Sequence, residues 1–423
     1  MLIYGVWTIY IIVLFISFFL LIVFLENGGI RDPVEYPEKW PKVTITIPAY
    51  NEEETISDTI QSALQTEYPE SKKEIIVVND GSQDQTQKEA QKHTEKENVR
   101  LINQENQGKG AALNTGLEKA EGKIFACLDA DSYLADDSLK NIVAELGEDE
   151  EGLASAMKVH KPQNFLQKLQ WVEYLVGIFM RNIMDDINSI HVTPGPLSIY
   201  RTDKLREVDG FDNSSLVEDQ EICFRFQENH WKVGHSRKGD SLTVAPETWK
   251  QFYNQRLRWY KGSIENIFKY KNMMLNSKYG DFGMFAVPTK LVQGVASIAG
   301  MFIISYYFLE PFFSFLRDFM VIGTDAIDLS MSEITIPFII NTIQWFVLGL
   351  EWITITFLAT LIFFSIFLFY IAALHTEEKP LEQGILAPAI YMFWYFIVIG
   401  FMWLVSFVSI TLDIILDREK RWT

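Results

Sequence analysis

Hydrophobic residues gather at the two ends of the chain, whereas its middle alternates short apolar runs with polar stretches. At the start, residues 2–25 contain no charged side chain, and a run of this length can cross the hydrocarbon core of a bilayer. A cleaved signal peptide is the alternative, but no basic residue precedes the run and no small-x-small cleavage pattern follows it. We therefore expect residues 1–26 to form an N-terminal transmembrane helix.

The C-terminal part of the chain, residues 285–423, predicts a second membrane region. Its uncharged runs are residues 291–309, 334–350, 352–374 and 385–412. Runs of this length predict an α-helical transmembrane region of about four spans. Only Glu351 separates the middle two runs, so they form either a tight helical hairpin or one span and an interfacial helix. Residues 311–315 are a candidate for a further interfacial piece.

Basic residues predict the orientation in the membrane. Arg31, Lys39 and Lys42 follow the first apolar run, no basic residue precedes it, and the chain ends in a basic segment at 417–423. Cytoplasmic segments of membrane proteins are enriched in Lys and Arg. We therefore expect an integral protein of the cell membrane with its N-terminus outside and its middle domain in the cytoplasm.

Strand-like and helix-like segments alternate in the first part of the middle domain, which we place at residues 40–248. The predicted strands are 43–47, 74–78, 99–102 and 123–128, and the predicted helices are 52–65, 83–95 and 109–120. Alternation at this spacing predicts βαβ units and a Rossmann-like, mostly parallel sheet. Ligands bind such sheets beyond the carboxyl ends of the strands. Asp80, Asp129 and Asp131 follow strand ends, so they lie where a site is expected.

Two later segments have the periodicity of amphipathic helices. One begins at Phe165, and the other occupies residues 249–284, with apolar positions from Trp249 to Ile267 on one helical face. Aromatic residues with basic neighbours suit helices that lie in the membrane interface. Core helices of a soluble domain show the same periodicity, so the pattern leaves both interpretations open.

Composition excludes some classes of protein. The formal net charge of −18 over 423 residues argues against a nucleic-acid partner, because binding phosphates requires a basic surface. The two cysteines, Cys127 and Cys223, lie far apart and predict neither a disulfide framework nor a cysteine zinc site. Two reduced thiols in a cytosolic domain are the simpler interpretation.

Asp129 and Asp131 are the first candidate for chemistry. Two carboxylates one residue apart, directly after a strand, suit Mg²⁺ or Mn²⁺, which take oxygen ligands and share themselves with phosphates. Lys109 lies near a predicted helix start in a glycine-rich segment, where it could contact a diphosphate. A plain glycine-rich turn is the alternative there, and the spacing is not that of a Walker A loop. Asp80, followed by glycine, is also compatible with a simple turn.

Two further motifs carry candidate side chains. Glu218 and Asp219 could supply the carboxylate base of a group transfer, or they could stabilise the N-terminus of a helix. Gln255, Arg258 and Trp259 share one face of a predicted helix. Arginine binds diphosphates and tryptophan stacks on sugar rings, although an amphipathic helix with snorkelling arginines has the same composition.

In their order along the chain, these motifs resemble those of membrane-embedded family 2 glycosyltransferases. The matching segments are Val-Asn-Asp-Gly-Ser around Asp80, Asp-Ala-Asp at 129–131, Glu-Asp at 218–219 and Gln-Arg-Leu-Arg-Trp at 255–259. The resemblance is to processive β-glycan synthases of the cellulose, chitin, hyaluronan and poly-N-acetylglucosamine types. It implies an α/β GT-A fold joined to transmembrane helices, and an inverting hexosyltransferase that uses a nucleotide sugar, usually UDP-linked, with Mg²⁺ or Mn²⁺.

The resemblance also implies roles for individual residues. It makes Asp219 the catalytic base with Glu218 as its neighbour, and it makes Asp131 the metal ligand. The residues that it implies for the donor are Pro48, Tyr50, Glu52, Asp80, Lys109 and Asp129. Those that it implies for the acceptor or the diphosphate are Gly195, Pro196, Gln255, Arg256, Arg258 and Trp259.

The function expected from this resemblance is sugar transfer to a growing β-linked polysaccharide at the inner membrane face, with translocation of the product. The segment Val-Glu-Asp-Gln at 217–220 is closer to the cellulose and poly-N-acetylglucosamine types than to the hyaluronan and chitin types. One alternative is a single transfer to a lipid acceptor, as in ceramide glucosyltransferases or enzymes that use polyprenyl phosphate. Another is a membrane transporter or scaffold, which the scarcity of charged residues in the predicted spans disfavours.

Overall fold

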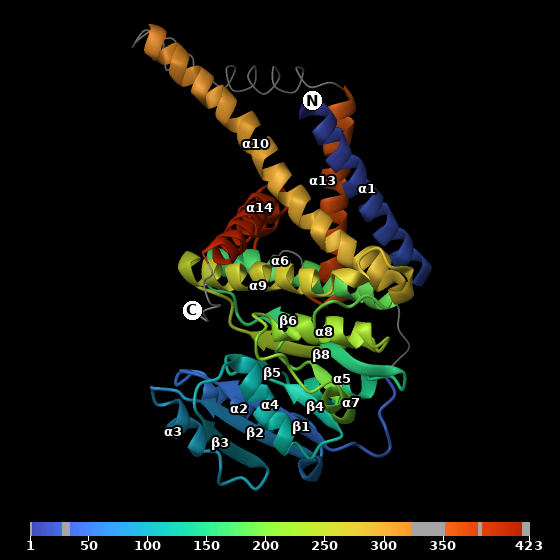
Figure 1. Cartoon of the computed structure of the whole chain (residues 1–423), viewed down its shortest axis with the longest axis vertical. Coiled ribbons are helices and arrows are strands. Elements are labelled where there is room, and N and C mark those ends of the chain that lie inside the picture. Colours follow the sequence, from blue (N-terminus) through green and yellow to red (C-terminus); the bar gives the residue numbers. More distant parts are fainter. Residues whose placement is uncertain (1, 28–33, 323–351, 380–382, 417–423) are drawn as a thin grey trace.

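A domain of sheet and helices lies at one end of the molecule, and long helices project from its other end (Figure 1). The computed structural model describes residues 2–27, 34–322, 352–379 and 383–416. Two helices, α6 (Phe165–Asp186) and α9 (Trp249–Lys269), lie across the molecule between these two parts (Figure 1). The arrangement therefore has three layers, and the middle layer joins the sheet to the apolar helices.

The sheet domain contains the alternation of strands and helices that the sequence predicts. Its strands are β1 (Val43–Ala49), β2 (Lys73–Asp80), β3 (Val99–Gln104), β4 (Ile124–Cys127), β5 (Ser132–Leu134), β6 (Glu150–Val159), β7 (Ile199–Arg201) and β8 (Lys232–Thr243). Its helices are α2 (Ile56–Gln65), α3 (Thr86–Gln91), α4 (Lys109–Lys119), α5 (Ser138–Glu145), α7 (Thr202–Glu207) and α8 (Glu218–Glu228). The four strands predicted from the sequence are β1 to β4, with ends shifted by a few residues.

The strands form one eight-stranded sheet in the order β3-β2-β1-β4-β7-β6-β8-β5. The first four are parallel, and their order reverses direction between β1 and β4, where α/β sheets bind ligands. Beyond β4 the sheet is mixed, because β7 runs antiparallel to both β4 and β6, and β5 runs antiparallel to β8. The predicted fold class is confirmed, but the parallel part of the sheet ends at β4.

Apolar burial on both faces holds the sheet in place. Every residue of β1 and of β2 is buried, as expected for parallel strands that helices cover on both sides. On one face, Ile45 packs in a core cluster with Ile60 of α2 and Ile142 of α5. On the other face, Phe125 shares a cluster with residues of α4, α6 and α8, including Leu113. The parallel strands thus hold their carboxyl ends along one rigid edge.

Side-chain caps fix the starts of the two helices in the middle layer. At α6, Asn164 accepts a hydrogen bond from the Gln167 backbone N–H at 2.9 Å, and the Gln167 side chain accepts one from the Asn164 backbone N–H in return. At α9, Thr248 and Gln251 form the same reciprocal pair. Both caps follow the Ser/Thr/Asn-x-x-Gln pattern that marks helix starts in sequences. After α9, short turns and one π-helical turn at Phe282–Ala286 fill the rest of the segment predicted as a single interface helix.

Apolar helices form the third layer. They are α1 (Leu2–Asn27), α10 (Val287–Ile322), α13 (Trp352–His375) and α14 (Leu386–Ile415). Within the described residues, Phe282–Ile303 and Ile397–Ile415 are long and apolar enough to cross a membrane, and Ile11–Glu26 and Ser365–His375 are shorter apolar helices. The predicted span 334–350 and the basic tail 417–423 lie outside the described residues. Residues 311–315 continue α10, so they are not a separate interfacial piece.

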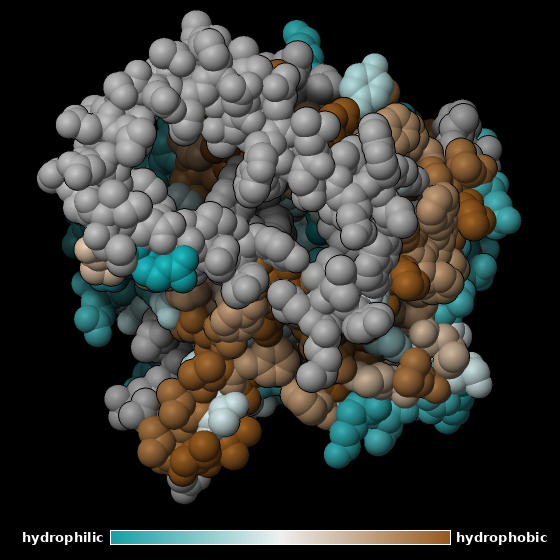
Figure 2. Space-filling view, turned by 90° about the horizontal axis from the view of Figure 1, so that it is seen from above, coloured by the Kyte–Doolittle hydropathy of each residue, from teal (hydrophilic) through white to brown (hydrophobic). Residues whose placement is uncertain are grey.

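The surface of this third layer is hydrophobic. Viewed from the helical end, the described atoms show broad brown areas, and polar atoms gather toward the rim (Figure 2). Large apolar side chains remain exposed on several helices, among them Phe15 at 66%, Phe302 at 55% and Phe363 at 64%. Exposed apolar surface of this extent is unusual for a soluble protein and is typical of a surface that faces lipid or another apolar partner.

Close packing of α4 on β1 depends on Gly116, where a Cβ atom would overlap the Thr46 side chain. We expect Gly116→Val to lower the free energy of unfolding of the sheet domain by about 2 to 3 kcal/mol, because the added atoms overpack this contact. The control is Glu118→Val, at an exposed position of the same helix. Urea unfolding followed by tryptophan fluorescence measures both, and equal losses in the two variants would contradict the packing argument.

Candidate active site

The loops that follow β1 and β2 are tied to each other at the carboxyl edge of the sheet. Asn51, whose φ is 56°, accepts a hydrogen bond from the Gln83 N–H at 2.8 Å and donates its own N–H to Ser82 at 3.0 Å. The Glu52 N–H donates to Thr86 Oγ1 at 2.7 Å. Pro48 lies inside β1, and Tyr50 is exposed just beyond that strand. The structure thus brings the first predicted donor loop next to the Asp80 segment.

Asp80 ends β2 and organises the loop before α4. One carboxylate oxygen accepts hydrogen bonds from Gln104 Nε2 at 2.7 Å and from the Gln107 N–H at 2.9 Å. The other accepts the Gly108 N–H at 2.8 Å. Asp80 is 3% exposed, so it holds the glycine-rich segment against the sheet. Gly108 has a φ of 90°, which glycine adopts without strain, and this turn starts α4 directly before Lys109.

Lys109 joins two of the predicted acidic motifs. Its Nζ lies 2.6 Å from Asp129 Oδ1 and 2.9 Å from Glu218 Oε1. Burial alone would lower the pKa of Lys109, but the charges of Asp129, Glu218 and Asp219 outweigh burial and raise it. The ammonium group therefore stays charged and holds the end of β4 against the start of α8.

The Asp131 carboxyl group lies among acidic side chains, and these outnumber the cations that act on it. Burial and the neighbouring Asp129 raise the pKa of Asp131 to about 6. Burial, with further contributions from Asp131 and Asp129, raises the pKa of Glu52 to about 7, although Thr55 donates a hydrogen bond that opposes this. Mutual repulsion of this kind is relieved by a bound cation. Among the described residues no group of three or more His, Cys, Asp or Glu side chains forms a complete metal cage.

The Pro194–Pro196 turn packs directly on this acidic group. A Cβ atom on Gly195 would lie 2.5 Å from Asp129 Oδ2, so a larger residue would displace that carboxylate. The next residue, Leu197, has a φ of 59°, and its N–H donates to the Cys127 carbonyl at 2.7 Å. A non-glycine residue in this region is strained, and such strain is often found at functional sites. Gly195 and Pro196 are therefore beside Asp129, as the sequence predicts for residues of one site.

Asp219 lies in the first turn of α8, next to Glu218. Burial, and then the charge of Glu218, raise the pKa of Asp219 to about 7. Burial would also raise the pKa of Glu218, but Lys109 and Arg258 lower it below the usual value. The pKa values of the two neighbouring carboxyl groups are thus separated. Glu218 is ionised at neutral pH, whereas Asp219 changes its protonation state near neutral pH. Paired carboxyl groups with separated pKa values are typical of acid–base catalysis.

Thr193 holds the backbone of Asp219 in place. The sequence does not predict Thr193 as a site residue. Its Oγ1 donates to the Asp219 carbonyl at 2.9 Å, and its backbone N–H donates to the same oxygen at 3.3 Å. Its Oγ1 also lies 2.6 Å from the Tyr200 hydroxyl. The one signal in the sequence was its position directly before the Pro-Gly-Pro turn.

The helix α9 brings the Gln-x-x-Arg-Trp motif to the start of α8. Arg258 Nη1 is 3.4 Å from the Leu216 carbonyl, and its charge acts on both Glu218 and Asp219. Gln255 Oε1 is buried and has no hydrogen-bond partner among the described residues. Trp259 is half-buried and packs at the edge of a core cluster that α6, α9 and α14 share. Of the predicted residues on this helix, Arg258 is the one in electrostatic contact with the carboxyl pair.

The prediction for Arg256 needs correction. Its guanidinium is buried and forms an ion pair with Glu173 of α6 at 2.5 Å, and Glu173 also accepts a hydrogen bond from Tyr395 of α14 at 2.7 Å. The same guanidinium stacks over the Trp259 ring at 4.2 Å. Arg256 therefore joins three helices instead of facing a diphosphate. Its neighbours in the sequence could not show this, because Glu173 and Tyr395 are distant along the chain.

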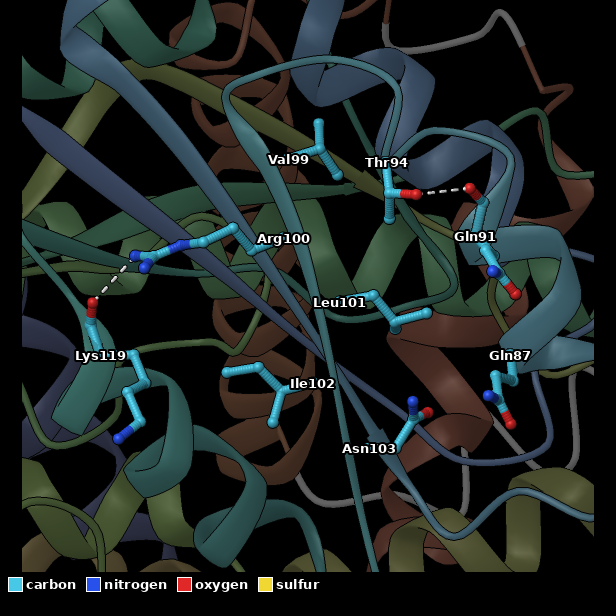
Figure 3. A pocket seen from close by; sticks show the side chains of 9 residues that line it. All are labelled: Gln87, Gln91, Thr94, Val99, Arg100, Leu101, Ile102, Asn103 and Lys119. Carbon is cyan, nitrogen blue, oxygen red and sulfur yellow. Dashed lines mark hydrogen bonds between the residues drawn. The ribbon is translucent and has the colours of Figure 1, made fainter.

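Two surface hollows lie away from these residues. The larger, about 640 Å³, is lined by α3, β3 and the end of α4, with Leu101 and Asn103 of the edge strand pointing into it (Figure 3). The other, about 630 Å³, lies between α8, the end of α9 and residues 208–214. None of the predicted site residues lines either hollow. The contacts and charges of those residues, and not a hollow, therefore define the candidate site.

Comparison with solved structures defines the class of this domain. The mannosyltransferase PcManGT from Pyrobaculum calidifontis, solved with GDP-Man and Mn²⁺, superposes with a TM-score of 0.56 at 17% sequence identity. The match covers 88% of this chain and 98% of that chain. The fold is thus that of the GT-A glycosyltransferases, as the resemblance implied.

Comparison of sequences then points to a family. Residues 44–209 match the model of the family described as glycosyl transferase family 2. Poly-beta-1,6-N-acetyl-D-glucosamine synthase of Staphylococcus epidermidis is 25% identical over 270 residues, covering 63% of this chain and 64% of that protein. The synthase of the same name from Staphylococcus aureus strain COL is 26% identical over the same lengths. The chain thus spans less than two thirds of these curated relatives.

The Arg256 cluster gives a prediction about stability. We expect Arg256→Met to lower the free energy of unfolding by about 2 to 3 kcal/mol, because Glu173 then lacks its cation in a half-buried position. Lys250→Met is the control, since Lys250 is an exposed cation on the same helix. Thermal unfolding in detergent measures both. Equal losses for Lys250→Met and Arg256→Met would contradict the assignment of Arg256 as the residue that joins the helices.

Proposed function

We propose that this protein is an inverting glycosyltransferase that moves a sugar from a nucleotide-sugar donor, UDP-linked, onto a growing β-linked glycan at the inner membrane face. An acceptor hydroxyl oxygen attacks the anomeric carbon of the donor sugar, and its proton passes to the Asp219 carboxylate. The bond from that carbon to the diphosphate breaks, and its electron pair leaves with UDP. Attack opposite the leaving group inverts the configuration.

One observation carries this proposal. Lys109 forms ion pairs with both Asp129 and Glu218, so the end of β4 and the start of α8 meet at one point of the sheet edge. The carboxyl group of Asp219, with its pKa raised to about 7, lies beside that point and suits a general base near neutral pH. Carboxyl groups with pKa values shifted in this way cluster at functional sites, which favours a catalytic role over a scaffold.

The residues beyond β4 fit a divalent cation. Asp131, with Asp129 beside it, would hold Mg²⁺ or Mn²⁺ there, and phosphate and water would complete the shell, as is usual for Mg²⁺. The cation would offset the negative charge that develops on the departing diphosphate. The raised pKa values of Asp131 and Glu52 support this, since burial and neighbouring carboxylates outweigh Lys109 at Asp131 and no cation lowers the pKa of Glu52 among its main causes.

The donor would extend from the Asp80 loop to the acidic group. Pro48, Tyr50 and Asp80 lie at the ends of neighbouring parallel strands, which suits a nucleoside. Arg258 and Gln255 approach from α9, and Trp259 offers an aromatic face on the acceptor side. Arg256 has no part in this proposal.

Membrane insertion with a cytoplasmic sheet domain is part of the proposal. The two membrane-length helices and the exposed apolar surface of the third layer support it (Figure 2). Figure 1 shows the N-terminus at the end of α1 that is remote from the sheet, as expected for an N-terminus outside the cell. The curated relatives named above are polysaccharide synthases, which supports a glycan product. Translocation of that glycan across the membrane is a further part of the proposal.

The pH profile tests Asp219 as the base. Because the base must be deprotonated, we expect kcat/KM to fall about tenfold per pH unit below about pH 7, as the raised pKa of Asp219 requires. Glu218→Gln removes the neighbouring charge that raises this pKa. The acid limb of the pH profile of that variant therefore moves to lower pH. Asp219→Asn should lose at least about a hundredfold in kcat with unchanged UDP binding. UDP release in vesicles measures these rates, and near-native turnover of Asp219→Asn would exclude Asp219 as the base.

Calorimetry tests the cation site without turnover. We expect Mn²⁺ to tighten UDP binding by about tenfold or more in the native protein, and Asp131→Asn to abolish that gain, because the ion then loses its protein ligand. Glu97→Gln, an exposed carboxyl group elsewhere in the domain, should keep the gain. Equal Mn²⁺ dependence in the native protein and in Asp131→Asn would remove Asp131 from the metal site.

A further inference from the structure

Three basic side chains from separate segments interact electrostatically near Asp219. Arg181 comes from α6, His191 from the loop before the Pro-Gly-Pro turn, and Lys290 from the first turn of α10. Burial lowers the pKa of His191 well below its usual value, and the charges of Lys290 and Arg181 lower it further. The charge of Asp219 in turn acts on Arg181, so the three groups share one electrostatic environment although they are far apart in the sequence.

Rigid contacts hold this basic cluster next to the proposed base. The Ser189 N–H donates to the Met184 carbonyl at 2.7 Å, which fixes one end of the His191 loop to α6. Thr193 fixes the other end to the Asp219 carbonyl. The Arg181 Nη1 lies 3.6 Å from the position of a Cβ atom on Gly177, so the guanidinium lies back along α6 toward that residue.

The cluster lacks the counter-charges that other wholly or partly buried cations of the protein have. Arg256 pairs with Glu173, Lys158 with Asp240, and Lys261 with Asp413. By contrast, no carboxylate within the described ranges forms an ion pair with Arg181 or Lys290, and Arg181 Nε is buried without a hydrogen-bond partner there. Burial lowers the pKa of Arg181 to about 10, while Asp219 and Tyr174 act in the opposite direction. Unpaired charges in such a position are costly, and an anionic ligand would stabilise them.

We propose that Arg181, His191 and Lys290 bind the phosphate group of a lipid-linked acceptor sugar, whose free hydroxyl then reaches Asp219. The inference rests on the proposed function and names the class of its acceptor: the glycan begins on a sugar joined to a lipid through phosphate. Lys290 lies within Phe282–Ile303, a segment long and apolar enough to cross a membrane, so the cluster is where a lipid headgroup would be. The donor diphosphate would have its own cations, Lys109 and the metal, beyond β4.

The test uses the full chain in nanodiscs with UDP-N-acetylglucosamine as donor and three acceptors. These are a decyl phosphodiester of N-acetylglucosamine, the uncharged decyl glycoside of the same sugar, and free N-acetylglucosamine phosphate. We expect a KM at least about tenfold lower for the charged lipid than for the uncharged one, as charge-assisted hydrogen bonds give. The free sugar phosphate should need a much higher concentration. If it serves as well as the charged lipid, the source of the phosphate is not a lipid and the proposal fails.

Variants assign this preference to the cluster. Arg181→Gln and Lys290→Gln should each raise the ratio of KM for the charged lipid to KM for the uncharged glycoside by about tenfold, because only the charged lipid loses a charge-assisted contact. Lys168→Gln is the matched control, because Lys168 lies on the same helix about 20 Å from Arg181 along its axis. Equal KM values for both lipids in the native protein, or equal losses for both in the variants, would overturn the proposal.

A binding measurement separates this inference from the proposed function. Native mass spectrometry with UDP present detects the charged lipid bound to the protein without any turnover. Retention of the charged lipid by the native protein and its loss in Arg181→Gln would support the phosphate site even if no sugar were transferred, in which case the proposed reaction alone would fail. Equal retention of both lipids by the native protein would refute the phosphate site, whatever the rate of UDP release.

Discussion

The ion pairs of Lys109 are the contact on which the rest of the site depends. The ammonium group sits between Asp129 and Glu218, which belong to segments about ninety residues apart in the chain. Without a cation there, burial would favour protonation of these carboxyl groups and their repulsion would push β4 and α8 apart. With it, Glu218 stays ionised while its neighbour Asp219 keeps a raised pKa. A single lysine thereby supports both the architecture of the sheet edge and the proton chemistry proposed for it.

The position of Lys109 follows in turn from Asp80. The Asp80 carboxylate accepts the N–H groups of Gln107 and Gly108, which fixes where α4 begins and therefore where the next side chain points. In the proposed reaction, Asp80 thus has two tasks, since it shapes this loop and lies where a nucleoside would bind. The edge of the sheet is preorganised by such contacts, and preorganised charges lower barriers without a cost of rearrangement during the reaction.

The middle layer couples this edge to the membrane helices. The helix α9 carries Arg258 toward the carboxyl pair and Arg256 toward Glu173 and Tyr395, on neighbouring positions of one element. A shift of α14 would therefore move Arg256 directly, and it would move Arg258 through the backbone of α9. The basic cluster links Arg181 of this layer with Lys290 of α10, so the acceptor we propose would meet the base where sheet domain and lipid adjoin.

Local patterns in the sequence determined much of this protein. The apolar period and the turn residues predicted the strands β1 to β4, the starts of α6 and α9, and the membrane-length helices, because these depend on near neighbours and on the solvent around them. The order of the acidic and aromatic motifs predicted the resemblance to family 2 glycosyltransferases, whose model matches residues 44–209. Only the tertiary structure decided that the sheet becomes mixed after β4, that Arg256 joins helices, and that Thr193 and Arg181 lie near Asp219. Those facts depend on which distant segments pack together. Buried charges repel or pair with one another only after these segments have packed.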